Sequence, residues 1–512
     1  MKRLIKNTPF LLAILLTVNV LFMAFFCAQK HVLFIDEALS YHHANHTSTN
    51  EDVSTCVSRP SVLKNLFIVA PNQKFHYSEI HDRLTVHPPL FYYILHTVNS
   101  FFPNNFSKWT GLSLNLVLFL FTQFFLYLLS RQFLSAEKSL GVVLFYGFSV
   151  GAICTVVFIR NYMLLTLLTT ILLFFGIKSL NAQEKSQKYL LFGFCPTLFL
   201  GCATHYYFFI TAFIFCAGIC LIHLVKKEYK KMYLFLISSL ASVGLCLLAF
   251  PMIKHHLLSS GRASQIFPTL KRNIIRAEYD LSPWDDFISQ DFLASFPIKY
   301  LTVALTFIGV IVLIYRLVKR QSVDARIVLI FSTLVSSVFL ISAVMPLDIR
   351  AMHTAQRYFF HIAPLFALSV IWLTDKMFSK RKYGYIIYMS FIVIILFLTL
   401  QKADLKIYLI KSPALEASFV NRLKDKTLYI KWVNNNKQEW LMLRGAQYSF
   451  EAQNAMIFKD WSDSCVQNIS EKKNAAIITP YPRYKYCKKI KNYTLYFYDS
   501  LICAYLPKTE TE

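Results

Sequence analysis

Two adjacent carboxylates, Asp36 and Glu37, lie a few residues beyond the first long apolar stretch of the sequence. Within the hydrocarbon core of a bilayer, each charged side chain would cost roughly 3 kcal/mol on insertion scales. Acids at the edge of a membrane are therefore either solvated loop residues or residues kept there for a function. The pair by itself favours the loop interpretation, and the other polar residues predicted on the same side of the membrane favour a function.

These other polar residues lie at the predicted outer ends of apolar stretches, far from Asp36 in the sequence. They are His87, Arg160, His205, Arg350 and Arg357, with Tyr162, Tyr206 and Tyr358 beside them. Arginine is among the most costly groups to place near lipid, and outer loops are where positive charge is least expected. The structural alternatives are a snorkelling side chain at Arg160 and a hydrogen-bonded histidine within a helical bundle at His205.

Arginine binds phosphate through paired hydrogen bonds, and a carboxylate can accept the proton of an attacking hydroxyl group. A lipid-linked sugar phosphate would place its phosphate at the depth of these side chains and leave its tail in the bilayer. Phosphate leaves readily once its charge is met, so such a site needs a base, positive charge and a means of positioning the substrate. The residues therefore indicate transfer of a phosphate-linked sugar at the membrane surface.

The composition of the chain shows which elements must position these residues. Of 512 residues, 55% are hydrophobic and only 16% are charged, far fewer charges than a soluble domain carries. Apolar stretches of about 17–22 residues recur, which predicts a polytopic α-helical membrane protein. The net charge of +25 comes mostly from short connectors between these stretches, so membrane topology explains it better than a nucleic-acid partner.

We predict about eleven spanning helices from the apolar stretches and the charges between them. They lie near residues 9–28, 109–130, 139–158, 161–178, 189–204, 206–224, 232–251, 298–316, 327–345, 359–374 and 383–401. With a cytoplasmic amino terminus, every inner turn then contains lysine or arginine. The first stretch is longer than the apolar core of a signal peptide, so we expect it to stay as a helix. The segment 88–102 is too short to cross, and a crossing would reverse the charge pattern, so we predict a helix lying on the outer surface.

This topology divides the chain into a membrane domain, residues 1–401, and a C-terminal tail, residues 402–512. The first outer loop, 29–108, would carry surface helices. Alternating apolar residues in the tail predict a small α/β domain outside the membrane. Four cysteines fall in polar regions, and an oxidising compartment would allow one or two disulfides in a pairing that the sequence leaves open. They are Cys56, Cys465, Cys487 and Cys503.

The order of these motifs resembles that of the GT-C glycosyltransferases. It is most similar to the bacterial branch related to protein O-mannosyltransferases and the lipid A aminoarabinose transferase, which use dolichyl- or polyprenyl-phosphate sugars. The motifs are Asp36-Glu37, His87-Pro88-Pro89-Leu90, Arg160-Asn161-Tyr162, His205-Tyr206 and Arg357-Tyr358. The resemblance covers about residues 1–400, and it departs from the family where Pro103-Asn104-Asn105 replaces an expected glycine.

The resemblance implies a role for each matching residue. Asp36 would act as the catalytic base or orient it, and Glu37 would support Asp36 or bind substrate. The donor phosphate would lie against Arg160, Arg357 and His87, where the aminoarabinose branch has lysine in place of the histidine. The substrate cavity would be lined by Tyr162, His205, Tyr206, Arg350 and Tyr358. Some members use a divalent metal and others do not, and Asp36 with His87 would supply only two ligands.

We therefore predict a membrane glycosyltransferase that moves a hexose or pentose, with inversion, from a polyprenyl-phosphate donor. The acceptor would be lipid A or another envelope glycan, a lipid or a protein, and the site would face the periplasm from a bacterial inner membrane. A transporter or lipid flippase is the alternative, but the central parts of the apolar stretches lack charged residues and no repeat is visible. A non-catalytic scaffold whose basic tail binds an acidic partner is a third interpretation.

Overall fold

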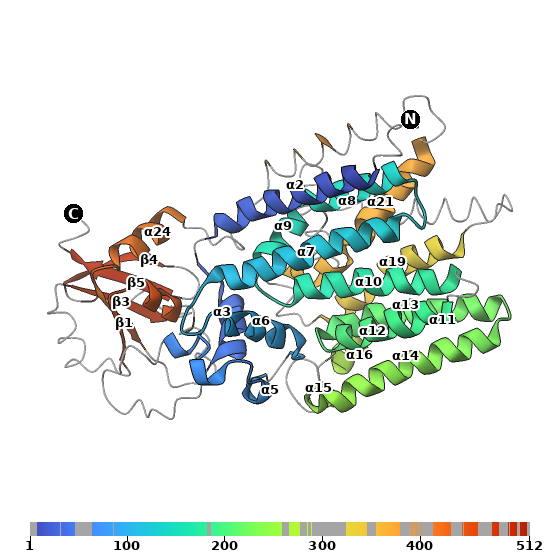
Figure 1. Cartoon of the computed structure of the whole chain (residues 1–512). Helices are drawn as coiled ribbons and strands as arrows, with labels where there is room; N and C mark the ends of the chain where they lie inside the picture. Colours follow the sequence, from blue (N-terminus) through green and yellow to red (C-terminus); the bar gives the residue numbers. More distant parts are fainter. Residues whose placement is uncertain are drawn as a thin grey trace. The chain divides into compact units, whose positions relative to one another are not determined.

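The computed structural model of the chain is shown in Figure 1. It describes residues 8–30, 32–46, 64–84, 87–181, 186–258, 266–276, 324–345, 355–378, 413–431, 445–458, 474–480, 492–498 and 502–508, with single positions between them. The chain forms two compact units. The first, here the helical unit, contains residues 1–27, 84–91 and 115–404, and the second, the loop–tail unit, contains residues 28–83, 92–114 and 405–512.

The helical unit is built from apolar helices long enough to cross a bilayer. In the described part of the chain seven helices pass this test, or eight when one bent pair is counted as a single span. The long helices are α2 (Thr8–Ala28), α7 (Lys108–Ser130), α10 (Tyr162–Asn181), α13 (Tyr206–Val225), α14 (Tyr229–Ala249) and α19 (Ala325–Val344). A last span is formed by η4 (Ala355–Ile362) and α21 (Ala363–Phe378). The chain is thus a multi-pass membrane protein, as predicted.

Two of the predicted spans are less regular than the sequence suggested. The span predicted at 139–158 is α8 (Ala136–Gly147) followed by α9 (Val150–Val157), with a bend of 59° between them. The hydroxyl group of Ser149 accepts a hydrogen bond from the Ala152 N–H and so begins the second helix. The span predicted at 189–204 is a run of α11 (Ser186–Tyr189), a π-helical turn η2 (Leu190–Phe194) and α12 (Cys195–Cys202). Pro196 has no N–H to donate four residues back, which favours this local change of helix type.

Two shorter helices complete the description of the helical unit, α15 (Pro251–Leu258) and α16 (Ile266–Arg276). Both lie in the outer connection predicted after the span at 232–251. The predicted spans at 298–316 and 383–401 lie outside the described residues, apart from single positions in the second. The domain boundary predicted at 401/402 borders residues 402–412, which are also outside the described part.

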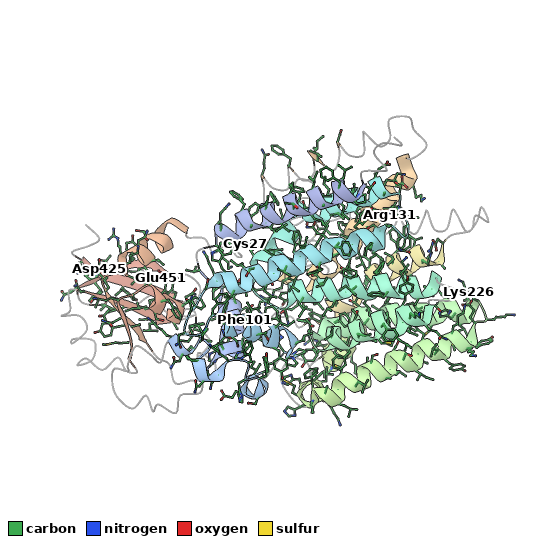
Figure 2. All side chains as sticks on the ribbon, in the orientation of Figure 1. Cys27, Phe101, Arg131, Lys226, Asp425 and Glu451 are labelled. Carbon is green, nitrogen blue, oxygen red and sulfur yellow. The ribbon has the colours of Figure 1, made fainter. Side chains whose placement is uncertain are left out.

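Arg131 and Lys226 lie at the same end of the helical unit, as the labels in Figure 2 show. Lys138 forms an ion pair with Asp375, joining α8 to α21. The Arg326 guanidinium group lies 5.7 Å from the centroid of the Phe133 ring. These contacts bring the connectors that were predicted to be cytoplasmic together at the same end, as the positive-inside rule expects.

The loop–tail unit contains the first outer loop and the C-terminal tail. Its helices are α3 (Ile35–Asn45), η1 (Pro71–Gln73), α5 (Ser78–Arg83), most of α6 (Leu90–Ser100), α24 (Pro413–Arg422) and η5 (Gln447–Phe450). Helix α6 has 11 residues, so at 1.5 Å per residue it is about 16 Å long and cannot cross a bilayer about 30 Å thick. The predicted short helix at 88–102 is therefore present.

The tail folds around a five-stranded sheet, which confirms a small C-terminal α/β region. Its strands are β1 (Thr427–Lys431), β2 (Asn454–Phe458), β3 (Ala475–Pro480), β4 (Tyr493–Tyr498) and β5 (Ile502–Pro507). The strand order is β2-β1-β3-β5-β4, with β1 parallel to β2 and β3 and with β5 antiparallel to both neighbours. Tyr429, Ile477 and Tyr505 pack in its core. Cys503 is disulfide-bonded, while Cys56, Cys465 and Cys487 lie outside the described residues.

Candidate active site

Two short turns and one earlier segment meet in the helical unit. The first turn, 158–161, joins α9 to α10, and the second, 203–205, joins α12 to α13. The Asn161 side-chain amide donates a hydrogen bond of 3.0 Å to the Thr204 carbonyl, which ties the turns together. The Leu90 N–H donates to the Ala203 carbonyl at 2.9 Å, which brings the segment containing His87 to the same place.

Arg160 and His87 are in direct contact. The Arg160 Nη2 lies 3.0 Å from the His87 Nε2, and only 6% of Arg160 is exposed. Arginine stays protonated in proteins, so the guanidinium group donates and the His87 Nε2 accepts. The neutral imidazole then holds its proton on Nδ1. The contact places the buried positive charge of Arg160 beside the neutral ring of His87. The family resemblance predicts that both residues lie against the donor phosphate.

Arg357 contacts the turn 158–161 through a cation–π interaction with Phe158. Its guanidinium carbon lies 5.3 Å from the centroid of the Tyr358 ring and 5.8 Å from that of Phe158, two residues before Arg160. Its Nη2 is 3.5 Å from the Tyr358 hydroxyl oxygen, and the side chain is 6% exposed. Cation–π contacts of this kind orient a guanidinium group while leaving its N–H groups directed sideways.

The pKa of His205 is affected by both Arg160 and Arg357. Its Nδ1 accepts the Tyr207 N–H at 3.1 Å, and its ring centroid lies 6.0 Å from His87 and 5.6 Å from Tyr162. Burial lowers the pKa of His205 to about 3, and the neighbouring side chains of His361, Arg160 and Arg357 act in the same direction. The imidazole is therefore neutral at pH 7, and the site presents two fixed positive charges beside neutral aromatic groups.

Six predicted site residues thus lie together in the helical unit. They are His87, Arg160, Tyr162, His205, Arg357 and Tyr358. We refer to them as the arginine cluster. Tyr206 is next to it in sequence, but its hydroxyl group bonds to the His256 Nδ1 at 2.7 Å. Arg350 lies outside the described residues. Two guanidinium groups with donors in a planar fork are suited to an anion such as phosphate.

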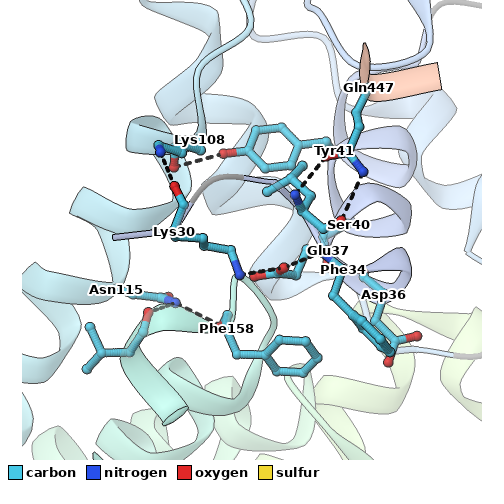
Figure 3. A network of polar contacts seen from close by, with 12 residues as sticks. Lys30, Phe34, Asp36, Glu37, Ser40, Tyr41, Lys108, Asn115, Phe158 and Gln447 are labelled. Carbon is cyan, nitrogen blue, oxygen red and sulfur yellow. Dashed lines mark hydrogen bonds and ion pairs between the residues drawn. The ribbon is translucent and has the colours of Figure 1, made fainter. Parts of the chain in front are cut away.

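The predicted acids belong to the loop–tail unit, at the start of α3. Glu37 is fully buried and forms an ion pair of 2.8 Å with the equally buried Lys30 (Figure 3). It also accepts the Phe34 N–H at 2.6 Å, which satisfies a backbone donor at the helix terminus. Asp36 is half-buried, and its carboxylate lies apart from this pair in Figure 3. The positive end of the helix dipole at this first turn favours a carboxylate there.

Several residues that position these groups were not among the predicted ones. Lys30 could have been found, because a lysine at the predicted outer end of a first span departs from the positive-inside pattern. Asn161 belongs to the motif Arg160-Asn161-Tyr162, but no role was predicted for it. Asn115, whose side chain donates to the Val156 and Phe158 carbonyls at 2.9 and 3.0 Å, has no local signature. Gln447, in the tail, also has no local sequence signature.

Among the residues that the structure describes, no three histidine, cysteine, aspartate or glutamate side chains come together as a ligand set.

Comparisons with known proteins were informative for solved structures. No protein-family model matches the sequence, and no curated protein matches it. Among solved structures, ArnT from Cupriavidus metallidurans in the apo state is similar, with 9% identity and a TM-score of 0.50, over 96% of this chain and 97% of that one. The oligosaccharyltransferase of Archaeoglobus fulgidus in complex with Zn and sulfate has 10% identity and a TM-score of 0.49, over 91% and 68% of the two chains. The likeness to ArnT gives the class of fold: this chain has the GT-C membrane fold with a small C-terminal sheet region.

Proposed function

We propose that this protein is an integral membrane glycosyltransferase of the GT-C type. It transfers a hexosyl or pentosyl group from a polyprenyl-phosphate donor to an acceptor of the cell envelope, which is a lipid A or other glycan, a lipid or a protein. The observation that carries the proposal is the arginine cluster, with two buried guanidinium groups, a neutral His205 and aromatic rings in one place. The GT-C fold, shared with ArnT, supports the same class of enzyme.

The proposed reaction uses the two predicted groups of residues in turn. Asp36 accepts the proton of the acceptor hydroxyl, and the hydroxyl oxygen forms a bond to the anomeric carbon of the sugar. The bond from that carbon to the phosphate oxygen breaks on the opposite face, so the configuration inverts. The phosphate leaves with the electron pair, and its charge is met by Arg160 and Arg357, with His87 beside them.

The distribution of charge supports the proposed side of the membrane. Within the helical unit, the turns 158–161 and 203–205 begin helices α10 and α13, and Lys178 and Lys226 follow at the other ends of those helices. The positive-inside rule places the lysine-rich ends in the cytoplasm. The arginine cluster then faces the periplasm, and we propose the bacterial inner membrane as its location.

The proposal is tested by the products that the protein makes. Envelope glycans and glycolipids of a deletion strain are compared by mass spectrometry with those of the strain complemented by the wild-type gene or by Asp36→Asn. General-base catalysis contributes about 10²–10⁴-fold, so the Asn variant should lose the product to that extent. Asp425→Asn, in an exposed turn of the tail, is the matched control and should restore the product fully. A well-expressed Asp36→Asn variant with full product would exclude the role of Asp36, and an unchanged glycan profile in the deletion strain would exclude transfer.

A further inference from the structure

We propose that Gln447, in the C-terminal tail, is a positioning residue for the helix that carries Asp36. The proposal rests on the proposed function, because Asp36 is the base in that reaction. It assigns the tail a part in catalysis through a contact with the first outer loop, rather than the recruitment of a partner alone. Both segments belong to the loop–tail unit.

The contact is made by a pair of hydrogen bonds. The Leu33 N–H donates to the Gln447 Oε1 at 2.7 Å, and the Gln447 Nε2 donates to the Leu33 carbonyl at 2.9 Å (Figure 3). The carboxamide therefore pairs with one backbone residue as a neighbouring strand would. Gln447 is 5% exposed and Leu33 is 1% exposed, so water is a poor substitute for either bond.

Leu33 directly precedes Phe34, the N-cap residue of α3. The Phe34 carbonyl accepts the N–H groups of Glu37 and Ala38 at 2.9 and 3.0 Å, and the Phe34 N–H donates to the Glu37 carboxylate. A backbone fixed at Leu33 thus fixes the first turn of the helix. Asp36 lies in that turn, three residues from the contact.

The same tail segment also reaches the other end of α3. The Phe450 ring stacks on Phe106 with centroids 4.5 Å apart and lies 6.1 Å from Phe67. The Phe67 carbonyl in turn accepts a hydrogen bond of 2.8 Å from Asn45, the last residue of α3. Residues 447–450 therefore contact the segments on both sides of the helix, which limits both its translation and its rotation. A shift of about 1 Å in a catalytic group can cost on the order of 100-fold in rate.

Backbone hydrogen exchange tests this coupling without any assumption about the substrate. The full-length protein in detergent is compared with Gln447→Leu, which keeps the approximate shape and removes both hydrogen bonds. Exchange at Leu33 and in the first turn of α3 should become roughly tenfold faster or more. Gln453→Leu, at an exposed position of the same tail, is the matched control and should leave exchange in 33–38 unchanged. Unchanged exchange in Gln447→Leu would overturn the proposal.

A second variant separates this pairing from general packing. In Gln447→Glu, a protonated carboxyl group has the same donor and acceptor pattern as the amide, whereas the ionised form has only acceptors. Protection of Leu33 and α3 should therefore return as the pH falls in Gln447→Glu and should not return in Gln447→Leu. Loss of protection in both variants at every pH would overturn the hydrogen-bonding role of the side chain.

Product formation in the complemented deletion strain then connects the contact to catalysis. Gln447→Leu should lower the envelope product at equal protein level, and Gln453→Leu should not. A variant that loses protection at α3 yet keeps full product would overturn the positioning role. If wild-type protein itself yields no transfer product, the proposed function fails, while the exchange experiment still decides whether Gln447 positions α3.

Discussion

The buried ion pair of Lys30 and Glu37 gives the sharpest test of how the first outer loop is held. Both side chains are fully buried, and their charged atoms lie 2.8 Å apart. The Lys108 ammonium group donates to the Lys30 carbonyl, so Lys30 is held at its backbone as well as at its side chain. Replacing Lys30 with Met keeps much of its volume but leaves the Glu37 carboxylate without its cation.

The expected cost follows from burial. Removing one partner of a buried ion pair typically destabilises a protein by about 3–5 kcal/mol, because a charge stays behind in a medium that solvates it poorly. Removing both charges is often nearly neutral. Lys30→Met should therefore be strongly destabilising, and the double variant Lys30→Met/Glu37→Gln should recover most of the loss, since glutamine can still accept the Phe34 N–H.

The measurement is a double-mutant cycle on the purified protein in detergent, with thermal unfolding for global stability and hydrogen exchange for α3. Lys231→Met breaks the ion pair with Glu228 in which both side chains are partly exposed, and it serves as the control with an expected effect below about 1 kcal/mol. If Lys30→Met costs no more than this control, or if the double variant is as unstable as the single one, the reasoning from burial is refuted.

Two further predictions concern the arginine cluster. Arg160→Lys keeps the charge but loses the planar fork, so product formation should fall about 10- to 100-fold in the mass-spectrometric assay, whereas Arg326→Lys at the opposite end should have little effect. His205 has a pKa of about 3 when folded and about 6.5 when unfolded, so the unfolded chain binds more protons between these values. Stability should therefore fall with pH below about 6.5, by up to about 1.4 kcal/mol per pH unit, and thermal unfolding of His205→Gln should show a weaker fall.

Much of the helical unit could be predicted because spanning helices leave a local signal. A run of apolar residues near α7 or α13 is long enough to identify a span without knowledge of its neighbours. The bend between α8 and α9 was missed: Ser149 caps the second helix locally, but the constraint on Gly147 comes from a contact with another helix. A Cβ atom at position 147 would come within 2.2 Å of the Asn19 side chain on α2, a constraint that no local pattern contains.

The motifs that contribute residues to the arginine cluster could be found in the sequence, because charge near lipid is rare and the motifs keep a recognisable order; the roles of these residues stay predictions. The contacts that hold α3 in place could not be predicted from the sequence. Gln447 and Leu33 are 414 residues apart, and a single glutamine in a polar tail has nothing to distinguish it from its neighbours. Glu37 was a predicted site residue and Lys30 was not. Their pairing depends on the path of the chain between the end of α2 and the start of α3, which the sequence does not show.

Several directional hydrogen bonds join α3 to other segments of the loop–tail unit. The Tyr41 hydroxyl group accepts the Gly111 N–H at 3.0 Å and lies 3.0 Å from the Ser107 carbonyl, to which it donates, and the His96 Nδ1 lies 2.8 Å from the Ala44 carbonyl. An apolar pair in place of Lys30 and Glu37 would often hold such a helix equally well or better. Directional polar contacts instead fix orientation, since each bond tolerates only a narrow range of distance and angle. If Asp36 in its first turn is the proposed base, α3 needs that precision, and we therefore expect substitutions in these contacts to lower turnover more than their effect on global unfolding would predict.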